Sequence, residues 1–153
     1  MKRAGFTMIE LIFVIVILGI LAAVAVPKLA ATRDDAKVAK GASAISTIVG
    51  DIGSYYTAQG KMGTNWSDMT NVPLYTSATA ETTTLATGVS AGTAVYFKDS
   101  ATTAGCVSFS VSSTDGNLTV VAESNSTSIC SGINSATVNI ARVHTFGGSS
   151  VSW

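Results

Sequence analysis

The chain has 153 residues, in which nine Lys and Arg balance nine Asp and Glu, so its formal net charge is zero. With 12 % of residues charged and 47 % hydrophobic, the composition excludes a disordered tail and a basic nucleic-acid binder, and no nucleic-acid partner is predicted. This length suits one domain with a modest core.

The hydrophobic residues are concentrated near the N-terminus. No residue from 11 to 26 carries a charged or polar side chain. With residues 6–10 added, a helix rising about 1.5 Å per residue would cover roughly 30 Å, the thickness of a bilayer's hydrocarbon core. The sequence therefore predicts a helix over residues 6–26 that can span a membrane once.

Three interpretations of this N-terminus compete. Lys2 and Arg3 before the apolar residues, and Ala23-Val24-Ala25 within them, fit a secretory signal cut after Ala25. The others are a permanent anchor and a segment that leaves the bilayer to pack into an assembly. Glu10 favours the last, because an ionised carboxylate in hydrocarbon costs about 2.5 to 3.5 kcal/mol. Its partner must come from a chain terminus or from another molecule.

Several short motifs follow one another in this region. They are a basic leader, a Gly-Phe junction, an acidic residue, and a later glycine and proline, at Lys2-Arg3, Gly5-Phe6, Glu10, Gly19 and Pro27. The pattern resembles the class III signal of type IV pilins and of the pseudopilins of type II secretion. The resemblance implies that residues 1–5 are a leader removed after Gly5, and that the new N-terminal Phe6 is N-methylated.

The same resemblance implies partners. They are a prepilin peptidase that is also the methyltransferase, an inner-membrane assembly platform, a cytoplasmic assembly ATPase, minor pilins, and further copies of this chain in a helical filament. The chain has no phosphate-binding glycine loop followed by Lys-Ser or Lys-Thr. We therefore do not expect it to power its own assembly.

The expected assembly contact joins Glu10 to the amine of Phe6. Cleavage after Gly5 would create an α-amino group that one methylation leaves charged. Apolar helices gain no hydrophobic energy by meeting in lipid, so an ion pair between Glu10 of one subunit and Phe6 of its neighbour would set their register. The alternative is that Glu10 only reaches the membrane interface near the helix start.

Gly19 and Pro27 are expected to weaken the same helix. Pro27 has no N–H and disfavours a hydrogen bond to the carbonyl of Ala23, which predicts a kink or a loosened turn. In filaments of families resembling this one, the stretch between such a glycine and proline can lose helical hydrogen bonds. Residues 19–27 would then be extensible, whereas a tolerated kink would have no role.

The composition changes after Pro27. Charged residues, expected to form a solvated collar or a contact between subunits, lie at Lys28, Arg33, Asp34, Asp35, Lys37 and Lys40. Apolar residues then recur every three or four positions, at Val38, Ala42, Ile45, Val49, Ile52 and Tyr56. This spacing predicts an amphipathic helix over residues 27–59 with one buried stripe.

Lys and Arg near the predicted span lie on both sides of it, so the excess of positive charge does not indicate which side is cytoplasmic. The cysteines give a separate indication of where the head lies. Cys106 and Cys130 are the only two cysteines. In a small head with an export signal they predict a disulfide that closes a loop of about 25 residues. We expect the N-terminus inside and the head outside, first in the bacterial inner membrane and then in a periplasmic or surface filament.

Residues 60–153 are predicted to form a β-rich head. Apolar and polar residues alternate over 107–111 and over 118–120, and Asp115-Gly116 between them indicates a hairpin turn. A third strand is expected over 137–143. The expected fold class is α+β, with a long N-terminal helix, half transmembrane and half amphipathic, packed on a small antiparallel sheet.

No catalytic constellation is found in the sequence. The one histidine, His144, lacks the companions that a catalytic triad or a zinc site requires. Calcium is a further hypothesis, since heads of some similar pseudopilins bind it, but no calcium-loop spacing fits the aspartates Asp51, Asp68, Asp99 and Asp115. We expect no enzyme activity, no cofactor and no metal.

Asn117 and Asn125 are candidate glycosylation sites. Each lies in an Asn-x-Ser/Thr motif with an acidic residue two positions earlier, which resembles the extended bacterial sequon. Turns and strand edges of a Ser/Thr-rich chain use the same residues, so a chance occurrence remains the alternative.

The predicted function is a structural subunit of a type IV pilus-like filament, assembled through the N-terminal helix. The first alternative is a pseudopilin that forms a periplasmic pseudopilus in type II secretion. The second, of another class, is an exported monomeric binding protein cut after Ala25 by an ordinary signal peptidase.

Overall fold

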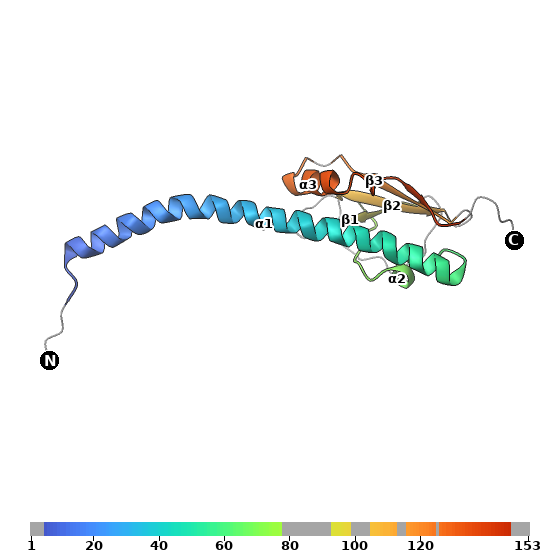
Figure 1. The fold of residues 1–153 in the computed structure, drawn as a ribbon, viewed down its shortest axis with the longest axis horizontal. Helices are drawn as coiled ribbons and strands as arrows, with labels where there is room; N and C mark the ends of the chain where they lie inside the picture. Colours follow the sequence, from blue (N-terminus) through green and yellow to red (C-terminus); the bar gives the residue numbers. More distant parts are fainter. Residues whose placement is uncertain (1–4, 78–92, 99–104, 113–115, 125, 148–153) are drawn as a thin grey trace. The chain divides into compact units, whose positions relative to one another are not determined.

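A computed structural model describes residues 5–77, 93–98, 105–112, 116–124 and 126–147 (Figure 1). Within these residues the fold is α+β, with three helices and one four-stranded antiparallel sheet. The predicted fold class is confirmed. Contacts divide the chain into two compact units, Met1–Ala36 and Lys37–Trp153.

The first unit contains the N-terminal part of helix α1, Met8–Gln59. Every described side chain of this unit is exposed. Among the described residues, α1 is the one helix long and apolar enough to cross a membrane. A helix that is apolar on all sides requires lipid or protein around it, so this unit is incomplete as an isolated chain in water.

In the second unit α1 becomes amphipathic. Its buried residues are Gly41, Ile45, Ile48 and Ile52. The stripe predicted from spacing is confirmed at two of its positions, while its other members, Val38, Ala42, Val49 and Tyr56, are half-buried. Helix α1 ends at Gln59 because Gly60 adopts a φ of +68° and donates its N–H to the carbonyl of Tyr56 at 2.8 Å.

The sheet lies in the second unit and has the strand order β1-β2-β3-β4. Its strands are β1 (Val95–Phe97), β2 (Val107–Ser112), β3 (Asn117–Ala122) and β4 (Val143–Thr145). The predicted hairpin is confirmed, since β2 pairs antiparallel with β3. Gly116 has a φ of +64°, a conformation that suits glycine in a turn, while Asp115 lies outside the described residues.

The apolar side chains of the sheet form the head core together with α1. Val107, Phe109, Val111, Leu118 and Val120 are all buried. A short helix, α2 (Trp66–Met69), adds Trp66 and Met69 to the same core. The alternation in the sequence therefore correctly indicates which side of the hairpin faces the core.

The predicted third strand over residues 137–143 is wrong. A helix that the sequence reading missed, α3 (Ser128–Ala136), precedes this segment, and β4 begins only at Val143. Thr137 is buried and its Oγ1 donates to the carbonyl of Ile133 at 2.9 Å. Residues 137–142 continue from the end of the helix into turns and bends, so the segment is not a strand before Val143.

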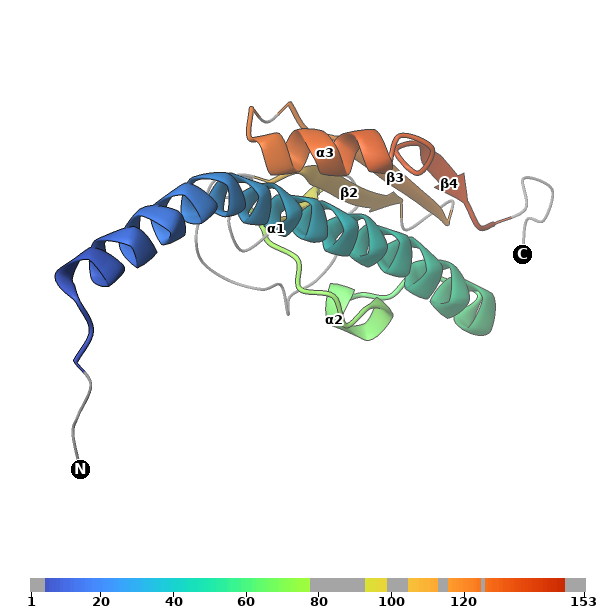
Figure 2. The ribbon, with the colours of Figure 1, turned by 60° about the vertical axis from the view of Figure 1, so that its left-hand side comes forward.

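Helices α1 and α3 pack closely, and both ribbon views show them side by side (Figures 1 and 2). A Cβ added to Gly41 would lie 2.6 Å from Cδ1 of Ile133, and one added to Gly132 would lie 2.6 Å from Cγ2 of Val38. In each helix, a glycine therefore packs directly against a side chain of the other helix. Without these two glycines the helices could not approach as closely.

Gly41→Ala is expected to destabilise the head by about 1 to 2 kcal/mol, because overpacking against the fully buried Ile133 exceeds the gain in helix propensity. Gly50→Ala is the matched control. Gly50 lies in the same helix with nothing within 4 Å of an added Cβ, so alanine should stabilise by about 0.5 to 1 kcal/mol. Urea unfolding of the full chain in detergent measures both, and shifts in the same direction would contradict the packing described.

Candidate functional site

The predicted cleavage junction lies just before α1. Gly5, Phe6 and Thr7 are non-helical and exposed, and the Phe6 side chain is 90 % exposed. Lys2 and Arg3 lie outside the described residues. The Gly5–Phe6 peptide bond is thus in a non-helical, exposed segment that a protease can reach.

Thr7 and Glu10 form a reciprocal hydrogen-bonded cap at the start of α1. The N–H and the Oγ1 of Thr7 donate to Oε2 of Glu10 at 2.8 and 2.7 Å. In return, the N–H of Glu10 donates to Oγ1 of Thr7 at 3.3 Å. This is a capping box, which satisfies backbone donors that the first helical turn leaves unpaired.

The cap gives Glu10 a role within its own chain. Both Thr7 donors use Oε2, and no donor among the described residues contacts Oε1. The predicted partner, the amine of Phe6 on a neighbouring subunit, belongs to another molecule, so that pair remains a prediction. The role of Thr7 was not predicted from the sequence, although Thr-x-x-Glu before an apolar run is a known start signal for helices.

Thr7→Val is expected to destabilise the first turn of α1 by about 1 kcal/mol, since valine can neither accept from nor donate to Glu10. Amide hydrogen exchange at residues 8–11, measured for the chain in detergent micelles, should become faster. Thr7→Ser keeps the hydroxyl and should exchange like the parent. Equal exchange in the valine variant would show that the cap does not stabilise the helix.

Gly19 and Pro27 both lie inside α1, which is helical through each of them. A Cβ added to Gly19 would meet nothing within 4 Å, so packing within the subunit does not require glycine there. Pro27 supplies no N–H to the helical ladder, and the carbonyl of Ala23 loses that donor. The extension of residues 19–27 under load remains a prediction.

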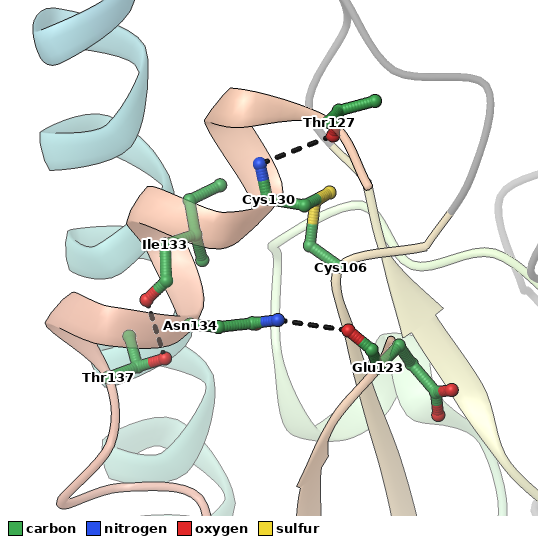
Figure 3. Close-up of a disulfide and its surroundings, with 7 residues drawn as sticks. All are labelled: Cys106, Glu123, Thr127, Cys130, Ile133, Asn134 and Thr137. Atoms are coloured by element: carbon green, nitrogen blue, oxygen red, sulfur yellow. Dashed lines mark hydrogen bonds between the residues drawn. A yellow bond between two sulfur atoms is a disulfide. The ribbon is translucent and has the colours of Figure 1, made fainter. Parts of the chain in front are cut away.

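The predicted disulfide is confirmed and joins α3 to the sheet (Figure 3). Cys106 and Cys130 are fully buried, and their Cα atoms are 4.9 Å apart. Beside the disulfide, Nδ2 of Asn134 donates to the carbonyl of Glu123 at 2.9 Å. Thr127 caps α3, its Oγ1 accepting from the N–H of Cys130 at 3.3 Å. Helix α3 is thereby attached to the sheet both covalently and by hydrogen bonding.

The described aspartates that were weighed for calcium make structural contacts. Oδ2 of Asp51 accepts from Oγ1 of Thr70 at 2.9 Å, which ties the segment after α2 to α1. Asp68 accepts from the side-chain amide of Asn65, while Asp99 and Asp115 lie outside the described residues. No group of three or more His, Cys, Asp or Glu that could hold a metal occurs in the described part of the chain.

His144 has a structural contact. Its Nε2 is 2.8 Å from the carbonyl of Ile140, so Nε2 carries the proton and donates it to that oxygen. The ring also stacks on Phe146, with ring centroids 6.4 Å apart. The first contact connects β4 to the turn that precedes it, and the second connects β4 to the residue that follows it.

Residues 1–26 match the family model described as the prokaryotic N-terminal methylation motif. No curated protein and no solved structure matched the chain. The matched segment contains the Gly5–Phe6 junction, Glu10 and the apolar residues, and it includes no part of the head. The resemblance recognised in the sequence is thereby confirmed: this N-terminus is the signal of a type IV pilin-like or pseudopilin precursor.

Proposed function

We propose that this type IV pilin-like or pseudopilin precursor is a structural subunit of a type IV pilus-like filament. The observation that carries the proposal is a methylation motif on a helix that is apolar and exposed on all sides. In this proposal a prepilin peptidase cuts after Gly5 and methylates the amine of Phe6. The processed chain then remains anchored in the membrane by its N-terminal helix until copies of it polymerise.

The membrane is the first environment of α1. Residues 11–26 are apolar on every side and would be covered by lipid, while Lys28 and Arg33 lie where the helix leaves the hydrocarbon. Extraction from lipid exposes the same surface again. Neighbouring helices must then cover it, so the surface that lipid covers before assembly is covered by other subunits in the filament.

Glu10 would set the register of the assembled helices. Van der Waals contacts between apolar helices discriminate poorly among axial positions, whereas a charge pair in a dry environment has one favourable geometry. Thr7 holds Oε2 of Glu10, and the methylated amine of the neighbouring Phe6 would approach Oε1. The capping box thus supports a carboxylate that is already oriented when a second subunit arrives.

The second unit also supports close packing of copies along α1. Besides Lys40 and Gln59, the exposed positions of α1 in this unit include a series of small residues, Ala39, Ser43, Ser46, Thr47 and Gly50. Oγ1 of Thr47 donates to the carbonyl of Ser43 at 3.0 Å, so covering this hydroxyl leaves no donor unpaired. Small residues allow helix backbones to approach closely.

Isolation of filaments tests the proposal. Filaments sheared from cells and probed with gold-labelled antibody against the head should carry this chain along their length. A filament confined to the periplasm would instead favour the pseudopilus of type II secretion, which uses the same N-terminal signal. Absence of the chain from filaments in both compartments would refute the structural role.

A further inference from the structure

We infer that strand β3 closes the Asn117 sequon to N-glycosylation once the head has folded, so a glycan can reach Asn117 only before β3 joins the sheet. The sequon runs from Asn117 to its hydroxyl residue, Thr119, and both lie in β3. The inference concerns the order of modification and folding, and it does not depend on the proposed function.

Strand β3 is an interior strand of the sheet. Asn117 pairs with Ser112 of β2 on one side and with Thr145 of β4 on the other. Thr119 is likewise paired on both sides, with Ser110 and Val143. No residue of the sequon can therefore leave its place without breaking contacts to two neighbouring strands.

The residue before the sequon is held as well. Gly116 accepts from the N–H of Phe146 at 3.1 Å, and a Cβ added to it would lie 2.6 Å from the ring of Tyr56. Gly116 is thus in close contact with Tyr56 of α1 and hydrogen-bonded to the residue after β4. Asn117 itself is half-buried, and its Oδ1 is buried with no hydrogen-bond partner among the described residues.

The chemistry of the transfer requires the sequon to leave this environment. Nδ2 of the asparagine attacks the anomeric carbon of a lipid-linked oligosaccharide. A C–N bond forms, the bond from that carbon to the lipid pyrophosphate breaks, and Nδ2 loses a proton. The enzyme must bind the asparagine together with its Ser or Thr, so residues 117–119 would have to separate from β2 and β4. Opening a central strand costs close to the free energy of global unfolding.

The test compares the same sequon in two states. A bacterial oligosaccharyltransferase and its lipid-linked oligosaccharide are incubated with the folded full-length Asn125→Gln chain in detergent, and separately with a peptide of residues 111–123. Intact mass reports the added glycan, and the double variant N117Q/N125Q gives the background. We expect the peptide to gain the glycan mass and the folded chain to remain unmodified.

Two results would overturn the inference. Modification of the folded Asn125→Gln chain to the same extent as the peptide would show that β3 does not protect Asn117. Failure to modify the peptide would show that the local sequence, and not the fold, excludes the site.

Discussion

Glu10→Ala is expected to reduce the yield of filaments on the order of a hundredfold or more while leaving the chain inserted in the membrane. Removing one member of a buried charge pair leaves the other unpaired at about 3 to 5 kcal/mol, and each 1.4 kcal/mol changes an equilibrium tenfold. Insertion should be unaffected, because alanine is less costly in hydrocarbon than a carboxylate.

The measurement is the ratio of sheared filaments to membrane-bound subunit in cells that produce each variant. Thr7→Val is the matched control, since it removes the intrachain cap but keeps the Glu10 carboxylate. It should lose much less filament than Glu10→Ala. Wild-type filament yield from the alanine variant would eliminate the charge pair as the contact that sets register.

Replacing both cysteines, in the variant C106A/C130A, is expected to lower the stability of the head by about 3 kcal/mol. The disulfide closes a segment with a sequence separation of 24, and its loss restores that entropy to the unfolded chain. Helix α3 has nine residues, too few to be stable without tertiary contacts. The contact between Ile133 of α3 and Gly41 of α1 should therefore be lost first.

Thermal unfolding of the full chain in detergent, followed by the fluorescence of the buried Trp66, should show a midpoint lower by roughly 10 °C. Asn134→Ala is the control. It removes the hydrogen bond to Glu123 but keeps the disulfide, and it should cost only about 1 kcal/mol. An unchanged midpoint in the double variant would mean that packing alone holds α3.

The parts of the fold that follow simple periodicity could be predicted from the sequence. The long helix, its end at Gly60 and the β2–β3 hairpin all agree with the structure. Strand β1 has only three residues, too few to show alternation, and it was missed. The approach of α1 to α3 at Gly41 and Gly132 depends on two residues distant in the chain, so no local pattern could indicate it.

Helix α3 was not predicted either, although the sequence does contain signals for it. Thr127 is a favourable N-cap residue, and Ile129 and Ile133 stand four positions apart on one helical face. Serine and glycine around them lower helix propensity and favour a loop in a local reading. The disulfide from Cys130 to Cys106, just before β2, and the burial of Ile133 against α1 outweigh that weak propensity.

The N-terminal site was the most predictable part because its residues are contiguous. A leader, a junction and an acidic residue at fixed spacing can be recognised without knowledge of the fold, and the match over residues 1–26 agrees with that reading. The capping contact of Thr7 adds what spacing alone had not revealed. The head gave no comparable signal, since the described aspartates and His144 serve structural contacts distributed over several elements.

The most direct test of the account is the intact mass and N-terminal sequence of the mature chain isolated from cells. The account predicts a chain that begins at Phe6, with the mass of one added methyl group on its amine. A mature chain that begins at Val26, cut after Ala25, or one that retains residues 1–5, would contradict it.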